Sequence, residues 1–453
     1  MPYEGEYASY GPLRRVVNSE RVQSLLKRCR RRDNGSPEAP ADHIAPAPVA
    51  PSGWAPEYII AIDGSHAEVP VETGFPGAEV SYVTVACVIL DVARMRELDA
   101  MRPVDPRDFR TLESPASIDS VIPGCNVVID GEAGAAASMR KLVFEEFKHE
   151  AMADDGESLL ETFEVLLGLK PASAREQRCP YDDCPTEATY RPTDGAVSCG
   201  CSLKRPLYST DALRFHEGMN AGGTNGAMFA EIMQVYERVW IVHILRTLEA
   251  KGWLSSLGRV AFVLDGPLAL FGHPAWVSQA ISKELMRLNG AVRDATGGRD
   301  ILLLGIEKTG MFVDHFTALD LDAKTNTARF ANQSVLLLTD EYIHKNVIFS
   351  KGKEYGKDTY FGRKLFYKTK SGARLVATLP YLEDDHRDLS RADASQFPRL
   401  ADAMSLMDQV VSSRYPNALM PLVSAHAEAA IPLHLGRKVL EELAKTLMKS
   451  SHG

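Results

Sequence analysis

The sequence contains no run of 18 or more apolar residues, so no segment has the pattern of a transmembrane helix. It begins Met-Pro-Tyr-Glu-Gly-Glu, which lacks the charged and then apolar segments of a signal peptide. We therefore expect a cytoplasmic protein without membrane contact. The phosphate-binding sequence Gly-x-x-x-x-Gly-Lys-Ser/Thr is also absent, which argues against a P-loop nucleotide-binding protein.

The sequence also lacks an excess of positive charge. It has 51 Lys and Arg residues against 60 Asp and Glu residues, a formal net charge of −9. This balance argues against a protein that coats nucleic acid. It does not exclude an enzyme that acts on nucleic acid, because phosphate contacts need only a local basic lining and a bound metal ion adds positive charge.

The length of 453 residues and the hydrophobic content of 45% predict a large core and two or three domains. Residues 1–32 contain a basic amphipathic helical pattern, which fits a helix packed loosely on the body or an arm that docks on DNA or on a partner. Residues 33–56 are rich in Pro and Ala and are predicted to be a linker. We expect the main domain at 57–440 and a C-terminal tail at 441–453.

Cysteine is scarce, and four of the seven cysteines lie close together in the sequence. Four thiolates in two close pairs can close a tetrahedral zinc site, and an intracellular location argues against disulfides. The alternative is four unrelated thiols. We predict a small zinc-binding insert at about 175–210 that holds a structural metal, with four ligands: Cys179, Cys184, Cys199 and Cys201.

Two apolar, strand-like segments each end on an aspartate. Residues 58–62 lead into Asp63-Gly-Ser, and residues 260–264 lead into Asp265-Gly. Two strand-end carboxylates that converge in space are what a divalent metal site needs. Each motif alone is equally a polar turn after a buried strand. Residues 80–90 are rich in β-branched residues and are predicted to pair antiparallel with the first strand.

A long helical pattern covers residues 228–248, with apolar residues at the spacing of a core-facing stripe. Glu237 borders this stripe, where a carboxylate is costly unless it is paired or binds a metal ion. Glu237 can also extend to solvent or pair with an arginine, and Glu231 is an alternative ligand that points elsewhere. Further helical patterns cover residues 138–167, 274–288, 400–411 and 432–448.

Basic residues occur in two places that suit contact with phosphate. Lys308 follows a strand-like segment and either faces a phosphate or pairs with Glu307. The segment 351–370 interleaves Lys and Arg residues, among them Arg363 and Lys364, with aromatic residues. This pattern is typical of a nucleic-acid groove in which aromatic rings stack on bases, and also of a solvated antiparallel hairpin.

An ordered set of short motifs resembles the NurA family of nucleases. It comprises Asp-Gly-Ser at 63–65, Glu237-Arg238 on a helix, Asp265-Gly after a strand, Tyr415-Pro, and Ala-His-Ala around His426. The small neighbours of His426 leave room for another element to approach it, although a histidine in such a setting is more often packed or capped. The four-cysteine insert is similar to that of the larger bacterial branch encoded with HerA-type ATPases.

The resemblance implies an α/β fold with an RNase H-like mixed sheet flanked by helices, assembled as a ring-like homodimer. It implies manganese- or magnesium-dependent cleavage of DNA, coupled to a hexameric HerA-type ATPase. Transferred to this sequence, the metal ligands are Asp63, Glu237, Asp265 and His426, with Tyr415 as a further catalytic residue.

The chemistry of these residues agrees with the resemblance, because two divalent ions about 4 Å apart can activate a water and stabilise a leaving oxygen. The histidine favours manganese, and Lys308, Arg363 and Lys364 are predicted to hold the DNA strand. The hypothesis is an end-processing nuclease that works in DNA repair or in defence against phage. The rival hypothesis is a non-catalytic, zinc-stabilised DNA clamp or scaffold for a DNA translocase. A phosphatase is disfavoured, because no second aspartate follows Asp63 two residues later.

Overall fold

The computed structural model describes most of the chain: residues 10–29, 49–72, 75, 77–93, 113–152, 156–170, 177–181, 184, 189–190, 195–322, 325, 327–348, 352–412, 417–430 and 435–450. It forms two compact units, Met1–Ile44 and Ala45–Gly453. The first unit contains α1 (Tyr10–Val17) and α2 (Glu20–Arg28), and neither helix has a buried residue. Ser19 is the N-cap of α2, because its Oγ accepts the N–H of Val22.

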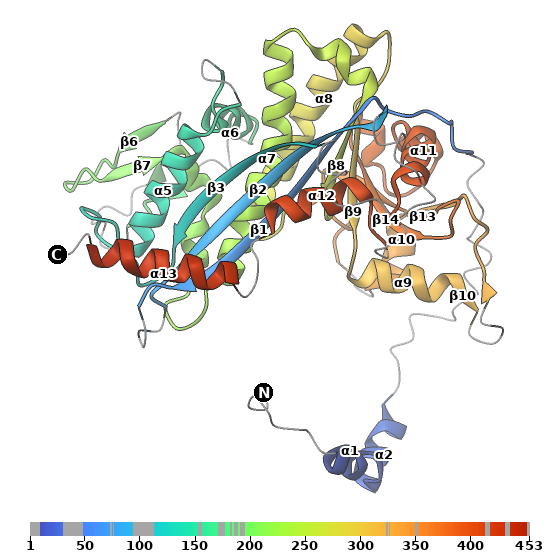
Figure 1. The fold of residues 1–453 in the computed structure, drawn as a ribbon, viewed down its shortest axis with the longest axis horizontal. Helices are drawn as coiled ribbons and strands as arrows, with labels where there is room; N and C mark the ends of the chain where they lie inside the picture. The colour runs from blue at the N-terminus through green and yellow to red at the C-terminus, as the bar shows by residue number, and fades with distance from the viewer. Residues whose placement is uncertain are drawn as a thin grey trace. The chain divides into compact units, whose positions relative to one another are not determined.

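The second unit is built on an eight-stranded mixed sheet with the strand order β12-β13-β14-β9-β8-β1-β2-β3. The antiparallel pairing of β1 with β2 that the sequence predicted is confirmed. β2 pairs antiparallel with β3, whereas β1, β8 and β9 run parallel, as expected of an RNase H-like core (Figure 1). The strands are β1 (Tyr58–Pro70), β2 (Glu79–Asp91), β3 (Glu113–Pro123), β8 (Val260–Asp265), β9 (Leu302–Glu307), β12 (Ser334–Leu337), β13 (Gly362–Lys368) and β14 (Arg374–Pro380).

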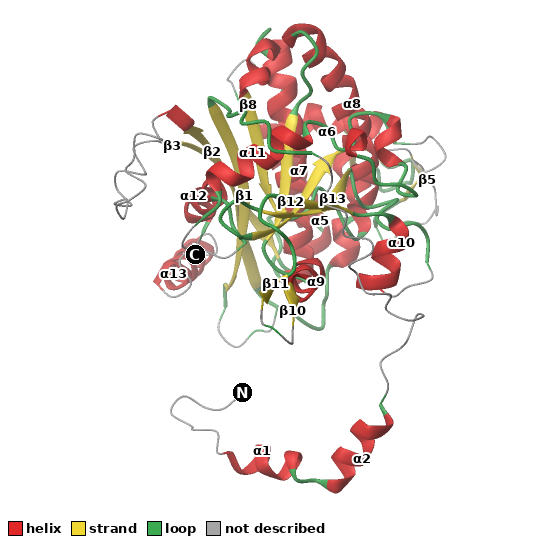
Figure 2. Cartoon of the chain, turned by 90° about the vertical axis from the view of Figure 1, so that its right-hand side faces the viewer, coloured by secondary structure: helices red, strands yellow, loops and turns green. Residues whose placement is uncertain are grey.

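Helices cover both faces of this sheet. Alternate residues of the central strands therefore pack into two different hydrophobic cores, one on each face. Ile60 and Ile62 of β1 belong to one core, and Ile59 and Ala61 to the other. Figure 2 shows the sheet between the two groups of helices. The first core is covered by α5 (Ala135–His149), α6 (Leu159–Gly168), α7 (Gly226–Ala250) and α8 (Trp276–Thr296); the second by α11 (Leu400–Val410) and α12 (Met420–Ala429).

The remaining elements are one further helix on the sheet and several short helices and strands. The helix α13 (Leu435–Ser450) packs on β1 and β2 through Ala444, so part of the predicted tail is a helix. No helix among the described residues combines the length and apolar character needed to cross a membrane. The short elements are α9 (Met311–Asp320), α10 (Asp340–Ile343), β10 (Leu321–Asp322), β11 (Thr327–Ala328), β4 (Gln177–Arg178), β5 (Thr189–Tyr190), β6 (Ala196–Ser198) and β7 (Pro206–Tyr208).

One predicted helix is wrong. The segment 138–167 forms two helices, α5 and α6, and Ala151 pairs with Ser158 between them. Ser158 begins α6 with a capping box, in which its Oγ and the Glu161 side chain satisfy each other's backbone N–H groups. Ser138 lies inside α5, where its Oγ donates to Gly134 O and accepts from Ile129 N. The helix predicted at 228–248 is confirmed as α7.

Candidate active site

The two predicted strand-end aspartates lie side by side on neighbouring strands. The strands β1 and β8 are parallel, with Ile62 opposite Leu264, so Asp63 and Asp265 form the next pair in register. Side chains in register on parallel strands share a face, and adjacent strands are about 4.8 Å apart. The strand β8 ends at Asp265, whereas β1 continues to Pro70. The sheet therefore opens beside the two carboxylates.

A cavity of about 870 Å³ occupies this opening. It brings together five residues singled out from the sequence, which come from five separate segments of the chain. They are Asp63, Glu237, Asp265, Lys308 and His426. Walls of Met233, Phe271 and Val423 surround these polar groups. Glu231, the alternative ligand on α7, does not line the cavity; its Oε1 accepts the N–H of His273 at 2.7 Å.

Glu237 reaches the cavity because Gly64 has no side chain. Gly64 follows Asp63 on β1 and faces α7, and a Cβ at this position would lie 2.5 Å from Glu237 Oε1 and 2.9 Å from Met233 Cγ. The Glu237 carboxylate is buried and paired with the guanidinium of Arg238. The predicted pairing of Glu237 with an arginine thus coexists with its position in the cavity.

Gly64→Ala tests the importance of this close approach. The added methyl group must displace the Glu237 carboxylate, and a shift of about 1 Å at a catalytic group can cost about 10²-fold in rate. We expect the variant to fold and to lose about 10²-fold of the DNA cleavage proposed below, measured on linear DNA. The matched control is Gly290→Ala in α8, where a Cβ would meet nothing within 4 Å. Equal losses in both variants would contradict the role of the close approach.

Asp63 is more buried than Asp265. Its Oδ1 accepts the N–H of Gly64 at 2.9 Å, and its Oδ2 lies 2.8 Å from Nδ1 of His426 on α12. Burial and the negative charge of Asp265 raise the pKa of Asp63 to about 6, although Lys308 and His426 act in the opposite direction. The His426 side chain is 60% exposed, so it connects the buried carboxylate to the mouth of the cavity.

Asp265 is held by a lysine and lies close to an arginine. Its Oδ2 accepts from Lys308 Nζ at 2.9 Å. The predicted pairing of Lys308 with Glu307 is not formed, because Glu307 pairs with Lys364, and the predicted contact of Lys308 with a phosphate stays a prediction. Burial lowers the pKa of Arg238 to about 10, against the opposing charges of Asp265 and Asp63, so this guanidinium stays charged at neutral pH. Both cations lie where they can compensate the carboxylates.

The charges that line the cavity nevertheless leave it acidic. Four carboxylates face two basic side chains, Arg238 and Lys308. A polyanion needs further positive charge to enter such a site, and a divalent ion would supply it. The donors suit magnesium or manganese, because they are carboxylate oxygens with one imidazole. The four carboxylates belong to Asp63, Glu237, Asp265 and Glu307, and any of them that bound an ion would give up a protein partner.

The NurA domain model matches residues 202–431, which is half of the chain. The chain belongs to the NurA family. The matched residues include Glu237, Asp265, Lys308 and His426, whereas Asp63 on β1 precedes them.

Two solved structures are similar to this NurA-family chain over nearly its whole length. A crystal structure of the NurA nuclease from Sulfolobus solfataricus is 11% identical, with 97% of each chain covered and a TM-score of 0.35. A second crystal structure of NurA is 9% identical, with 96% of this chain and 97% of that chain covered and a TM-score of 0.27. No curated protein matches the chain.

Two residues predicted to bind the substrate do not line the NurA cavity. Arg363 is 2% exposed and donates to the carbonyl oxygens of Leu338, Asp388 and Arg391. Lys364 is also buried, and its Nζ pairs with Glu307 Oε1. The prediction that these side chains hold DNA does not fit this structure, since both are buried and paired with other groups of the protein.

The aromatic residues of the same segment are part of the core. Tyr360 and Phe361 precede β13 and are buried. Phe366 and Tyr367 are buried within β13, which lies between β12 and β14 and has no exposed residue. Neither a nucleic-acid groove nor a solvated hairpin describes this strand. Tyr415 and Lys351 lie outside the described residues.

Three residues that line the cavity were not predicted from the sequence to belong to the site. Gly64 gives Glu237 access, Arg238 pairs with it, and Glu307 adds a fourth carboxylate from β9. The Glu307 carboxylate is positioned by the buried Lys364. The sequence signal for Glu307 was its place at the end of a third parallel strand, next to Lys308.

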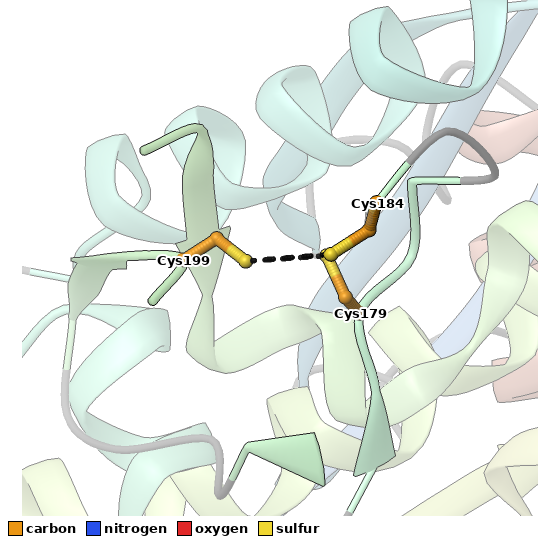
Figure 3. A group of neighbouring side chains, drawn as sticks. All are labelled: Cys179, Cys184 and Cys199. Atoms are coloured by element: carbon orange, nitrogen blue, oxygen red, sulfur yellow. Dashed lines mark hydrogen bonds between the residues drawn. The ribbon is translucent and has the colours of Figure 1, made fainter. Parts of the chain in front are cut away.

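Three of the four clustered cysteines converge. The Sγ atoms of Cys179, Cys184 and Cys199 lie within 4.8 Å of one another, the only such group of metal-binding atoms among the described residues. Figure 3 shows the three side chains pointing toward one another from two separate segments. Cys201 is buried in the same small cluster. Sulfur donors at this spacing suit a tetrahedral metal site.

Proposed function

We propose that this NurA-family chain is a metal-dependent DNA nuclease whose active site is the cavity at the end of β8. The observation that supports the proposal most directly is the in-register pair Asp63 and Asp265 in one cavity with Glu237 and His426. Hydrolysis of a phosphodiester requires an activated water and a stabilised leaving oxygen. An acidic, partly enclosed site that needs a cation to accept a phosphate suits that reaction.

The roles of the residues follow from their environments. Asp63, Glu237 and Asp265 would hold manganese or magnesium through their carboxylate oxygens, with His426 as a fourth donor. A bound divalent ion supplies positive charge to the phosphate and makes water a stronger nucleophile at neutral pH.

Lys308 and His426 can also act on the substrate directly. Lys308 Nζ, now on Asp265, can turn to a phosphate oxygen once that carboxylate binds a cation. His426, hydrogen-bonded to Asp63 through Nδ1 and largely exposed, is placed to take up or release a proton at Nε2.

Metal dependence is the direct test of this proposal. Linear DNA is expected to be degraded by the purified chain with manganese or magnesium and to stay intact in a chelator, with activity restored when the ion is returned. Gel analysis of end-labelled fragments would follow the products. Binding of DNA without cleavage under every metal tested would instead favour the rival hypothesis of a non-catalytic clamp or scaffold.

The partner, the oligomeric state and the cellular role of this chain stay predictions that rest on the resemblance to the NurA family. A hexameric HerA-type ATPase would deliver DNA to the cavity, and a homodimer of this chain would receive it. End processing in DNA repair and defence against phage DNA are both consistent with such a reaction, as is a cytoplasmic location.

We also propose that the four cysteines bind one zinc ion as a structural site. The insert is built from two-stranded pieces, β4 with β5 and β6 with β7, which are too small to be stable by themselves. Metal binding supplies folding energy to such modules.

The zinc site predicts a difference between cysteines. The purified protein is expected to contain about one zinc per chain by elemental analysis. Cys199→Ser should lose the zinc and become sensitive to protease in the insert, because the ligand cluster holds its two segments together. Cys125→Ser should keep both properties, since this half-buried cysteine lies outside the cluster. A wild-type protein free of zinc would contradict the site.

A further inference from the structure

Phe271 is an exposed aromatic residue at the proposed active site. It lines the cavity together with the four carboxylates, and 44% of its surface is exposed. A single exposed phenylalanine needs no functional explanation in itself. Its surroundings distinguish it, because the protein holds both its backbone and its ring in place.

The backbone around Phe271 is held by hydrogen bonds from other elements. Leu270 N donates to Thr359 O at 2.9 Å, and Phe361 N donates to Leu268 O at 2.9 Å. On the other side, Gly272 has a φ of +72°, and a Cβ there would lie 2.1 Å from Glu231 Oε1. The chain therefore turns at one defined position immediately after Phe271.

The ring of Phe271 is supported by a buried neighbour. It packs edge-on against Tyr360, with centroids 5.8 Å apart and planes at 80°. Tyr360 is 5% exposed, and its hydroxyl accepts from Tyr355 at 2.7 Å. A rigid aromatic side chain loses little conformational entropy when it binds a ligand.

The walls of the cavity suit a nucleotide better than a phosphate alone. The acidic groups lie on β1 and α7 and at the ends of β8 and β9, whereas Met233, Phe271 and Val423 present apolar surface. A phosphodiester placed at the carboxylates carries its sugars and bases toward such walls. Aromatic side chains bind bases of any sequence by stacking on them.

We propose that Phe271 stacks on a base of the DNA strand next to the scissile phosphate and so positions that phosphate at the carboxylates. This inference rests on the proposed nuclease function and adds a positioning residue to it. The ligand is an unstacked base, so the chain prefers strands whose end is single-stranded or easily opened over stable duplex ends.

The test compares Phe271→Ala with Phe271→Trp on single-stranded oligonucleotides. Loss of one stacked base is expected to raise KM by about 5- to 150-fold, with a smaller change in kcat, and the tryptophan variant should restore KM. Trp253→Ala is the matched control, because Trp253 is an exposed aromatic residue that does not line the cavity.

Abasic substrates separate stacking from a general effect of the substitution. A single abasic nucleotide at the stacked position should raise KM for the wild type and leave Phe271→Ala unchanged. Equal KM values for the wild type and Phe271→Ala would overturn the inference and leave the nuclease function in place. A Phe271→Ala defect of the same size on every abasic substrate would also overturn it. A wild-type protein that cleaves no DNA under any metal would overturn both.

Discussion

Asp63→Asn and Asp265→Asn are each expected to lower the rate of metal-dependent DNA cleavage by about 10³-fold or more. A divalent ion contributes several kcal/mol of charge stabilisation, and each 1.36 kcal/mol is a factor of ten. Asparagine keeps the shape of the side chain but removes the negative charge that binds the cation. Single-turnover cleavage of an end-labelled DNA at saturating manganese would measure the loss. Asp294→Asn, at an exposed position of α8, is the matched control.

The loss of cleavage must not result from unfolding of the variants. The pKa of Asp63 predicts how its substitution affects stability. Burial and the charge of Asp265 raise that pKa from 3.8 to about 6, so the ionised carboxylate is disfavoured in the folded state. The folded protein then binds the extra proton, and stability rises as the pH falls from about 6 toward 4. In a chelator at pH 7.5, Asp63→Asn should therefore melt no lower than the wild type. Wild-type cleavage rates in both variants would refute the shared metal site.

The carboxylates could be identified from the sequence because their context is local. Asp63 and Asp265 each follow five apolar residues and precede a glycine, and so short a run with a glycine beside it predicts a buried strand. The helical stripe of α7 likewise revealed Glu237 at its border. Their convergence was not visible, since it depends on the parallel register of β1 with β8 across about 200 residues. The family resemblance supplied that link.

The basic and aromatic segment shows where sequence reasoning failed. Residues 362–368 alternate in a way that equally suits a surface hairpin and a central strand, and only the position of β13 between β12 and β14 decides. Arg363 and Lys364 are charged and therefore suggested solvent, yet each finds buried partners supplied by distant segments. Similarly, nothing in the sequence marks Gly64 as the point where α7 approaches β1.

Lys364→Met is expected to destabilise the protein by about 3–5 kcal/mol, because it leaves Glu307 buried without its cation. Lys364 Nζ is enclosed by Glu307 and by the rings of Phe312 and Tyr360, at 3.7 and 5.1 Å from their centroids. Burial lowers the pKa of this lysine, and the Glu307 carboxylate opposes the shift. Urea unfolding would measure the difference in the free energy of unfolding between the variant and the wild type.

The double variant Lys364→Met with Glu307→Met separates a structural pair from a DNA contact. Removal of both charges of a buried pair is often neutral, so most of the lost stability should return. Cleavage should not return in full, because the double variant also lacks a carboxylate that lines the cavity beside Lys308. If Lys364 instead contacted DNA, the single variant would weaken DNA binding at unchanged stability, and adding Glu307→Met would rescue nothing. Recovery of stability without full recovery of activity would make Lys364 a residue that positions Glu307 at the site, and not one that binds the substrate.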